Sequence, residues 1–367
     1  MNSTTFLTNS NPSKSILLKL EFKIQSEMKI VDINTEKINN IFEELTLNVG
    51  GKLTFDSDEY SLEVNNNFAK GSIIGSSFND DISYIQFDMT FAVDVRMNIT
   101  NLKASPVYFA YCSKGNLSHS FGILGEERKL KTFQTAILSS QKDHEHVLFF
   151  EKDIKTQFTL IIVGTQVEAN KNNTLNESVR ETFFGDNTSE DFFYIGSYNL
   201  RIAEKIEQLN AVTQNGIVRN LLKEGILRII LAMEIQQHTD DLLAASKDSN
   251  CLTLREMEEI KELSEAIKAN PEEAFTIKSL SKRSGLSPNK LQEGFKMIHN
   301  RTVNDYITHM RVLKAEILIR TSDLNISEIV YCIGFTSRSY FSKIFKQKFN
   351  CSPKEYKFNL NPLAITA

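Results

Sequence analysis

The sequence predicts an α+β protein of several domains. We expect an N-terminal β-rich domain built like a sandwich or barrel, a helical connector, and an all-α C-terminal domain with two helix-turn-helix units. The first reason is length, because 367 residues exceed one ordinary domain. The second is pattern, because short β-branched and aromatic runs fill the first half and helical periodicity fills the second. The composition, 41% hydrophobic and 24% charged, is typical of a globular chain.

The expected boundaries follow changes in composition. The polar residues 1–15 predict a disordered tail, since they lack the apolar stretch of a secretory signal. The β-rich domain is expected over 16–197 and the helical connector over 198–246. A polar linker over 247–254 would then lead into the all-α domain at 255–360.

The location of the protein can be predicted from two absences in the sequence. The most apolar run, 226–235, contains Arg228 and Glu234 and is shorter than the about 20 residues that a bilayer span requires. The four cysteines lie far apart without a C-x-x-C pair, which argues against a disulfide framework or a cysteine zinc site. We therefore expect a cytoplasmic protein with reduced thiols, no membrane contact and no cofactor.

Charge is divided unevenly along the chain. From Glu259 onward there are 17 Lys and Arg against 11 Asp and Glu, whereas the first 258 residues hold 25 against 35. A basic end is attracted to a polyanion such as nucleic acid, and an acidic body is repelled by it. The alternative is a chance fluctuation of surface charge.

The first half contains four clear strand candidates and one helix candidate. The helix is expected over 35–47, where Thr35 would be the cap and Ile38, Ile41, Phe42 and Leu45 share one face. Turns rich in Gly, Asn, Asp and Ser separate the strands, which favours an antiparallel arrangement. The strand candidates are SYIQFDMTF, SPVYFAYC, HVLFFE and QFTLIIV.

Two helices are expected in the connector, over 198–214 and 217–245. The second has apolar residues over a face too wide for a lone surface helix. That face could pack onto the β-rich domain, or part of it could stay exposed and pair with a second chain. The residues concerned are Leu221, Leu222, Ile226, Ile229, Ile230, Met233 and Ile235.

The basic end contains a first helix-turn-helix pattern. A helix over 276–284 ends at Gly285, and Ser287 with Pro288 begins the next helix with a cap and a first-turn proline. Leu291, Phe295 and Ile298 would be buried at i, i+4 and i+7. The outward residues, which could reach base edges or phosphates in a major groove, are Asn289, Lys290, Gln292, Glu293 and Lys296.

The pattern repeats about fifty residues later. A helix over 327–333 is ended by Gly334, and Thr336 and Ser337 are the candidate caps of the next helix. In that helix the expected buried residues are Tyr340, Phe341, Ile344 and Phe345, and the expected outward ones are Arg338, Ser339, Ser342, Lys343 and Lys346. A middle helix over 303–320 would join the two units through Tyr306, Ile307, Met310, Leu313, Ile317 and Leu318.

Residues 255–358 resemble the DNA-binding domain of the AraC/XylS family of bacterial transcription regulators. The match is strongest in IGFTSRSYFSKIFKQKFNCSPKEYK, which contains the family's Gly-Phe, Ser-Tyr-Phe-Ser, Phe-Lys and closing Ser-Pro-x-x-Tyr. The segments KLQEGFK and TVNDYI are similar to the PchR-like subgroup, in which the N-terminal domain senses a small molecule.

The resemblance implies which residues contact DNA. Base edges would be read by Asn289, Gln292, Glu293, Arg338, Ser339, Ser342 and Lys343, and phosphates would be held by Ser287, Lys290, Lys296, Thr336, Ser337 and Lys346. Arg338 is the best candidate for a bidentate contact with guanine.

Several residues depart from the family pattern. Asn300 and Asn350 replace the usual Gly, and Asn is the next best residue for a left-handed turn. Ser281 and Val330 replace the customary Ala of the two supporting helices, which would loosen or shift their packing. Glu293 repels phosphate and favours a cytosine amino group, so the first unit is expected to bind more weakly than the second, or with a different preference.

The N-terminal domain offers little catalytic or metal chemistry. His144, Glu145 and His146 followed by Glu151 are spaced like metal ligands, with His119 the only other nearby candidate. The flanking glycines and a second His segment are missing, so a solvated pair and no metal is the expectation. Cys112 is expected to be a buried apolar residue, and no motif indicates an enzyme. An aromatic small-molecule pocket is expected among Phe87, Phe91, Tyr108, Phe109, Tyr111 and Phe121.

The resemblance therefore implies a non-enzymatic transcription activator with an N-terminal small-molecule sensor. Its expected partners are double-stranded promoter DNA, a small effector, a second copy of the chain in a homodimer, and RNA polymerase. The main alternative is that the N-terminal domain binds another protein instead of a small molecule. A fused DNA-repair alkyl acceptor is a weaker alternative, since it would need a reactive cysteine and clustered zinc cysteines.

Overall fold

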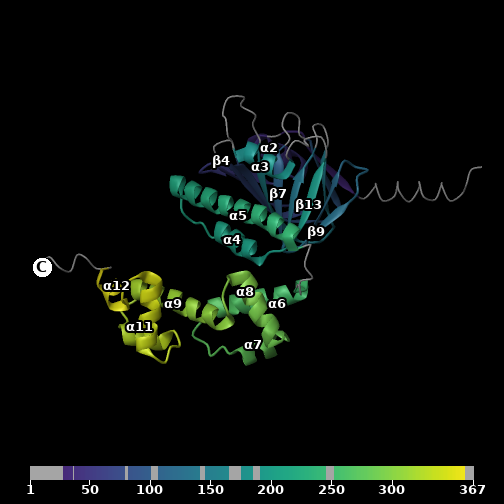
Figure 1. Cartoon of the computed structure of the whole chain (residues 1–367). Coiled ribbons are helices and arrows are strands. Elements are labelled where there is room, and N and C mark those ends of the chain that lie inside the picture. The colour runs from purple at the N-terminus through teal and green to yellow at the C-terminus, as the bar shows by residue number, and fades with distance from the viewer. Residues whose placement is uncertain are drawn as a thin grey trace, which may run out of the picture. The chain divides into compact units, whose positions relative to one another are not determined.

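The computed structural model describes residues 28–35, 37–78, 82–100, 106–140, 145–164, 175–184, 191–244 and 252–359. It divides into two compact units, Met1–Asp248 and Ser249–Ala367 (Figure 1). The predicted tail at 1–15 lies outside the described residues, as do residues 247–251 of the predicted linker.

The N-terminal unit consists of two β-sheets, which confirms the predicted β-rich sandwich. One sheet has five strands in the order β1-β6-β11-β8-β9, and the other has eight in the order β13-β10-β7-β12-β5-β4-β3-β2. Pairing is antiparallel between described strands except for β1 and β6, which run parallel. The strands are β1 (Lys29–Ile33), β2 (Lys52–Asp56), β3 (Glu59–Asn65), β4 (Ala69–Phe78), β5 (Ile82–Phe91), β6 (Val95–Ile99), β7 (Val107–Lys114), β8 (Asn116–Phe121), β9 (Arg128–Lys131), β10 (Gln134–Ser139), β11 (His146–Phe150), β12 (Thr156–Val163) and β13 (Phe192–Tyr198).

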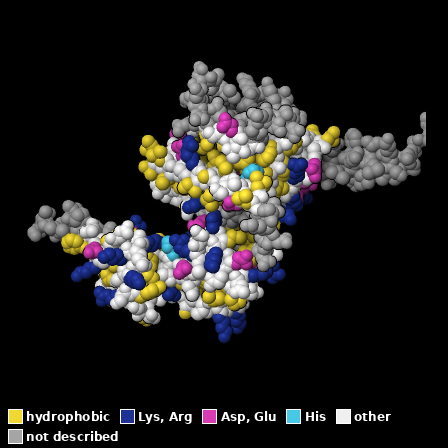
Figure 2. All heavy atoms as spheres, in the orientation of Figure 1, with side chains coloured by type: hydrophobic (Ala, Val, Ile, Leu, Met, Phe, Trp, Pro, Cys, Tyr) yellow, Lys and Arg dark blue, Asp and Glu magenta, His cyan; other side chains and the backbone are white. Residues whose placement is uncertain are grey.

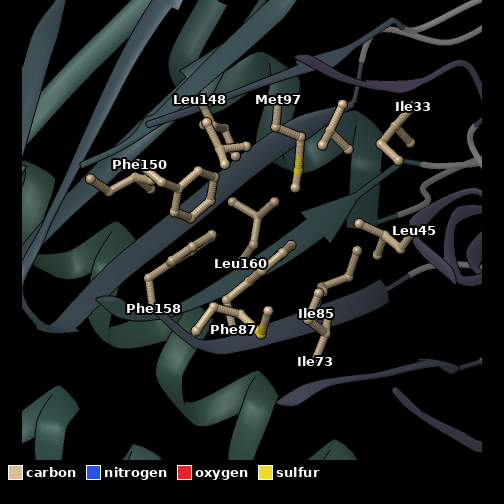
Figure 3. Close-up of a cluster of buried hydrophobic side chains, with 14 of the residues drawn as sticks. Ile33, Leu45, Ile73, Ile85, Phe87, Met97, Leu148, Phe150, Phe158 and Leu160 are labelled. Carbon is tan, nitrogen blue, oxygen red and sulfur yellow. The ribbon is translucent and has the colours of Figure 1, made fainter. Parts of the chain in front are cut away.

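The core of this unit lies between the inner faces of the two sheets. Met97 and Leu148 from the five-stranded sheet point toward Phe87 and Leu160 from the eight-stranded sheet (Figure 3). All four predicted strand runs form strands here, β5, β7, β11 and β12. Their alternation puts one set of side chains in this core and the other set on the outer faces.

The first helix begins later than predicted. It is α2 (Ile38–Val49), preceded by Lys37, whose side chain makes no capping hydrogen bond, so the expected Thr35 cap is wrong. The helix is instead held by its apolar face, because Ile41, Phe42 and Leu45 are buried in the sheet core.

Two further helices, α4 (Leu200–Asn210) and α5 (Gly216–Ala244), follow the last strand, and a short α3 (Leu175–Phe184) precedes it. The α4 helix is shorter than the predicted 198–214, since the Asn199 side chain accepts hydrogen bonds from the backbone N–H of Arg201 and Ile202 and caps it there.

The α5 helix lies across the outer face of the eight-stranded sheet (Figure 1). At one end, Lys223 and Arg219 donate to the buried Glu59 of β3, which also accepts from Tyr84 of β5. At the other end, Asp241 accepts from the backbone N–H and the hydroxyl of Ser197 in β13. Of the seven apolar residues predicted for the wide face of α5, Ile230 is buried, whereas Leu221, Leu222 and Ile229 are exposed, so that face is covered only in part.

The C-terminal unit is helical throughout its described residues. Its helices are α6 (Leu254–Ala269), α7 (Ile277–Ser284), α8 (Pro288–His299), α9 (Val303–Thr321), α10 (Ile326–Cys332), α11 (Arg338–Phe349) and α12 (Pro353–Asn359). The α9 helix joins a first half made of α6, α7 and α8 to a second half made of α10, α11 and α12 (Figure 1).

Candidate nucleic-acid interface

The first helix-turn-helix unit consists of α7 and α8. Thr276 caps α7 through a reciprocal pair of hydrogen bonds with Ser279, and Gly285 ends it with a φ of 72°. The Ser287 hydroxyl accepts from the backbone N–H of Lys290 and caps α8, with Pro288 in its first turn. The local signals in the sequence thus place both helices.

The outward residues of α8 do not all remain available. Asn289, Glu293 and Lys296 are exposed, as predicted. Lys290 is ion-paired with Glu256 of α6, which lowers the pKa of that carboxyl. Gln292 is half-buried, and its Oε1 accepts from the backbone N–H of Val303 at 3.1 Å. Gln292 thus orders the start of α9, a role that the helical pattern alone could not indicate.

The second unit consists of α10 and α11. Asn325 and Glu328 form the capping box of α10, and Gly334 follows the helix with a φ of 76°. Of the two predicted caps of α11, Ser337 accepts from the backbone N–H of Tyr340, whereas no capping bond is made by Thr336. Four of the residues of α11 that were predicted to contact DNA are exposed, namely Arg338, Ser339, Lys343 and Lys346. The fifth, Ser342, is half-buried.

Two residues predicted to be buried are exposed. Tyr340 is 51% exposed, because it lies about 100° around the helix from Phe341, which is buried together with Phe345. Ile317 of α9 is 48% exposed, whereas Val312, Ala315 and Ile319 form the buried stripe of that helix. Tyr340 therefore joins the outward face of α11, and sequence periodicity assigned it to the wrong side.

Arg311 of α9 connects the two halves of the C-terminal unit. Its Nε donates to the carbonyl of Pro271 at 2.7 Å, its Nη2 to the carbonyl of Glu273 at 2.9 Å, and its Nη1 to the carbonyl of Gly334 at 3.0 Å. A Cβ on Gly334 would lie 2.5 Å from the carbonyl oxygen of Glu272. The turn of the second unit is thus packed against the loop before the first unit.

The departures from the usual family residues are accommodated. Asn300 and Asn350 adopt φ values of 54° and 58° at the ends of α8 and α11, which confirms the predicted left-handed turns. The hydroxyl of Ser281 donates to the carbonyl of Leu286 inside the first turn, and Val330 is buried in the second half. Both side chains are therefore packed within their supporting helix-turn-helix units.

Figure 2 shows Lys and Arg side chains over the visible face of the C-terminal unit. The exposed cations of α8 and α11 include Lys296, Arg338, Lys343 and Lys346. These positive charges attract phosphates. The C-terminal unit thus presents two exposed polar helices, α8 and α11.

The predicted aromatic pocket of the N-terminal unit does not form as expected. A narrow apolar cavity of about 30 Å³ lies inside the β-sandwich and is lined by Phe87 and Tyr108 of the six predicted residues. Phe91 packs farther along the core, against Phe150. Phe109 and Tyr111 are on the other face of β7, as alternation along a strand requires, and Phe121 contacts His146.

The histidine segment is only partly described, because His144 lies outside the described residues. His146 is buried, not solvated, and its Nδ1 lies 3.0 Å from Nε2 of His119 on the neighbouring strand. Burial lowers the pKa of His119 to about 3 and that of His146 well below its usual value. No cluster of three metal-ligating side chains occurs among the described residues. Cys112 is buried, as predicted, and burial raises its pKa to about 12.

Comparison with known proteins gives the class of the C-terminal unit. Residues 280–358 match a family described as a helix-turn-helix domain. The regulatory protein SoxS of Escherichia coli K12 is 31% identical over 101 residues, which cover 28% of this chain and 94% of SoxS. The chain therefore belongs to the AraC family of transcription regulators.

Other relatives match only in part. The transcriptional regulator AlkR of Acinetobacter baylyi is 37% identical over 25% of this chain and 30% of AlkR. Histidine kinase P4 of Formosa agariphila is 39% identical over 23% of this chain and 6% of the kinase. The chain thus spans less than a third of the length of these two relatives. Among the described residues, no helix has both the length and the hydropathy that crossing a bilayer requires.

Proposed function

We propose that this protein is a sequence-specific transcription regulator that binds promoter DNA through α8 and α11. The observation that carries the proposal is that both helices are the exposed second helices of helix-turn-helix units, joined within one unit by α9 and Arg311. The two helices would enter successive major-groove segments on one face of the duplex, about 34 Å apart. The site for one subunit is then asymmetric.

The proposed base contacts are those whose side chains remain available. Arg338, Ser339 and Lys343 on α11 and Asn289 and Glu293 on α8 would read base edges. Lys296 and Lys346, with the hydroxyls of Ser287, Thr336 and Ser337, would hold phosphates. Gln292 and Lys290 would contribute less, because each already has a protein partner. The second unit would then dominate recognition.

We further propose that the protein acts as an activator in a homodimer. Five neighbouring residues of α5 form an exposed apolar stripe, although the opposite face of the helix is buried against the sheet. The stripe residues are Val218, Leu221, Leu222, Gly225 and Ile229. A Cβ at Gly225 would touch nothing within 4 Å, so a second helix could approach closely there. A second copy of this stripe is the proposed occupant, and contact with RNA polymerase would follow at the promoter.

The N-terminal unit is proposed to sense a small molecule through the cavity beside Phe87 and Tyr108. A cavity of about 30 Å³ holds about one water molecule, so an effector would have to widen it. The small volume of this cavity strengthens the alternative, in which the N-terminal unit binds another protein instead of a small molecule.

The experiment is sedimentation of the full chain with a labelled duplex taken from beside its own gene, with and without cell-extract metabolites. Specific binding that exceeds binding to a mixed-sequence duplex supports the regulator. A change in dimer population or affinity on adding metabolites supports the sensor. Specific binding that no metabolite alters would favour the protein-binding alternative, and equal binding to all duplexes would contradict the regulator.

A further inference from the structure

An open groove of about 560 Å³ lies between α9 and α11. Arg301, in the turn after α8, lies at one side of it, and Lys343, Gln347 and Lys348 of α11 lie at the other. Lys343 also belongs to the outward face of α11. The groove is therefore continuous with the surface that is proposed to read DNA.

The groove contains more positive charge than its own residues neutralise. Arg301, Lys343 and Lys348 line it with a single acid, Asp305. Asp305 accepts a hydrogen bond from the hydroxyl of Thr302 at 2.6 Å, which holds one of its oxygens at the start of α9. Within the described part of the chain, none of the three cations forms an ion pair with a carboxylate. Three cations against one acid leave the lining of the groove with net positive charge.

The excess of positive charge affects the pKa of Lys348. Its ammonium lies 3.1 Å from Nδ1 of His309 and is half-buried. Burial, together with the charge of Arg301, lowers the pKa of Lys348 to about 8. Burial and the charges of Lys348 and Arg301 lower the pKa of His309 to about 4, so this imidazole is neutral and can accept from Lys348. An anion in the groove would stabilise Lys348 in its charged form.

We propose that this groove holds phosphate groups of the DNA backbone, between the segments read by α8 and α11, with Arg301 and Lys348 as the direct ligands. The inference rests on the proposed DNA-binding function. It adds a phosphate site to the base contacts that are proposed for α8 and α11. Arg301 donates from Nη1 to the carbonyl of His299 at 3.1 Å, and its remaining N–H donors can bond phosphate oxygens while a lysine adds a point charge beside them. A long polyanion fits better than a small free anion because the groove is open and runs into the outward face of α11.

The test measures the salt dependence of binding to a mixed-sequence duplex and to the promoter fragment. A variant that removes one phosphate-binding charge makes the slope of log affinity against log salt shallower by about 0.9. Arg301→Gln and Lys348→Gln are each expected to show this change, with the same fold-loss of affinity on both duplexes. Arg320→Gln, at the far end of α9 and outside the groove, removes one charge as a control and should leave the slope unchanged.

The outcomes separate the groove from the wider proposal. Wild-type slopes in both groove variants overturn the phosphate site even when DNA binding is intact, whereas a wild-type chain that binds no duplex overturns the DNA-binding function itself. Pyrophosphate added at constant ionic strength tests the free-anion source. The proposal would be overturned if Arg301→Gln and Lys348→Gln weakened pyrophosphate binding but left the salt dependence of DNA affinity unchanged. The groove would then be a site for a small anion. Lys348→Arg keeps the charge, and its slope should match the wild type.

Discussion

Arg338 begins α11 with an exposed side chain, which has no ion pair among the described residues. Because a guanidinium can donate two parallel hydrogen bonds to guanine, Arg338→Ala is expected to cost about 1–3 kcal/mol of binding free energy at a single base pair. Competition between the promoter fragment and its point variants measures this. Equal loss on every sequence, as expected for Lys346→Ala, would make Arg338 a phosphate contact instead.

The buried pair His119 and His146 predicts sensitivity of the N-terminal unit to acid. The pKa of His119 is about 3 in the folded chain and about 6.5 when unfolded, so only the unfolded state takes up a proton as pH falls below 6.5. The contribution to stability is complete above this pH and is lost toward pH 3. Between pH 7.5 and 5 the loss from His119 is about 2 kcal/mol.

The measurement is urea unfolding, followed by a probe in the N-terminal unit, at these two pH values. His119→Gln keeps a donor for His146 and should show a smaller drop than the wild type between pH 7.5 and 5. The difference between the two drops is the readout, and it reports on His119 together with its effect on the pKa of His146. An identical drop in the variant would contradict the assignment.

At the scale of elements, we expect Arg311 to fix the spacing of α8 and α11, because it bonds both the loop before α7 and the turn before α11. Arg311→Lys keeps the charge but loses the fork that reaches Pro271, Glu273 and Gly334. We expect a loss of unfolding free energy of about 2 kcal/mol, because partly buried carbonyls lose charged donors. DNA affinity should fall for a duplex that contains the segments read by both α8 and α11. It should stay unchanged for a duplex that contains only one of these segments.

Thermal unfolding and binding to the two duplexes measure these effects of Arg311→Lys. Lys314→Arg is the matched control on the same helix, since it preserves the ion pair with Glu272. Equal loss of affinity on one-site and two-site duplexes would show that Arg311 does not set the spacing.

At the scale of the whole molecule, the exposed stripe of α5 predicts the oligomeric state. Leu221, which is 62% exposed, lies at its centre, and Leu221→Glu would place a charge in the proposed helix pair. We expect the dimer to dissociate at least tenfold more readily in sedimentation velocity, with the unfolding temperature of the monomer unchanged. Leu242→Glu, also on α5 but outside the stripe, is the control and should leave the dimer intact. A wild-type chain that sediments as a monomer would contradict the dimer.

The sequence by itself determined the elements and the class of the protein. Caps such as Ser287 and Ser337, and the left-handed Asn300 and Asn350, act within a few residues of their own position, so local chemistry predicts them. Strands such as β5 and β12 were equally readable from alternation and β-branched content. The helix-turn-helix pair and its family followed from these local signals.

Only the tertiary structure decided which side chains are free to act. Gln292 and Lys290 were engaged by Val303 and Glu256 from other elements, and Tyr340 turned outward because Phe341 and Phe345 filled the core. His119 met His146 across a strand pair. Partners distant in sequence make these contacts, and a periodicity measured along one helix or strand contains no information about what packs against it.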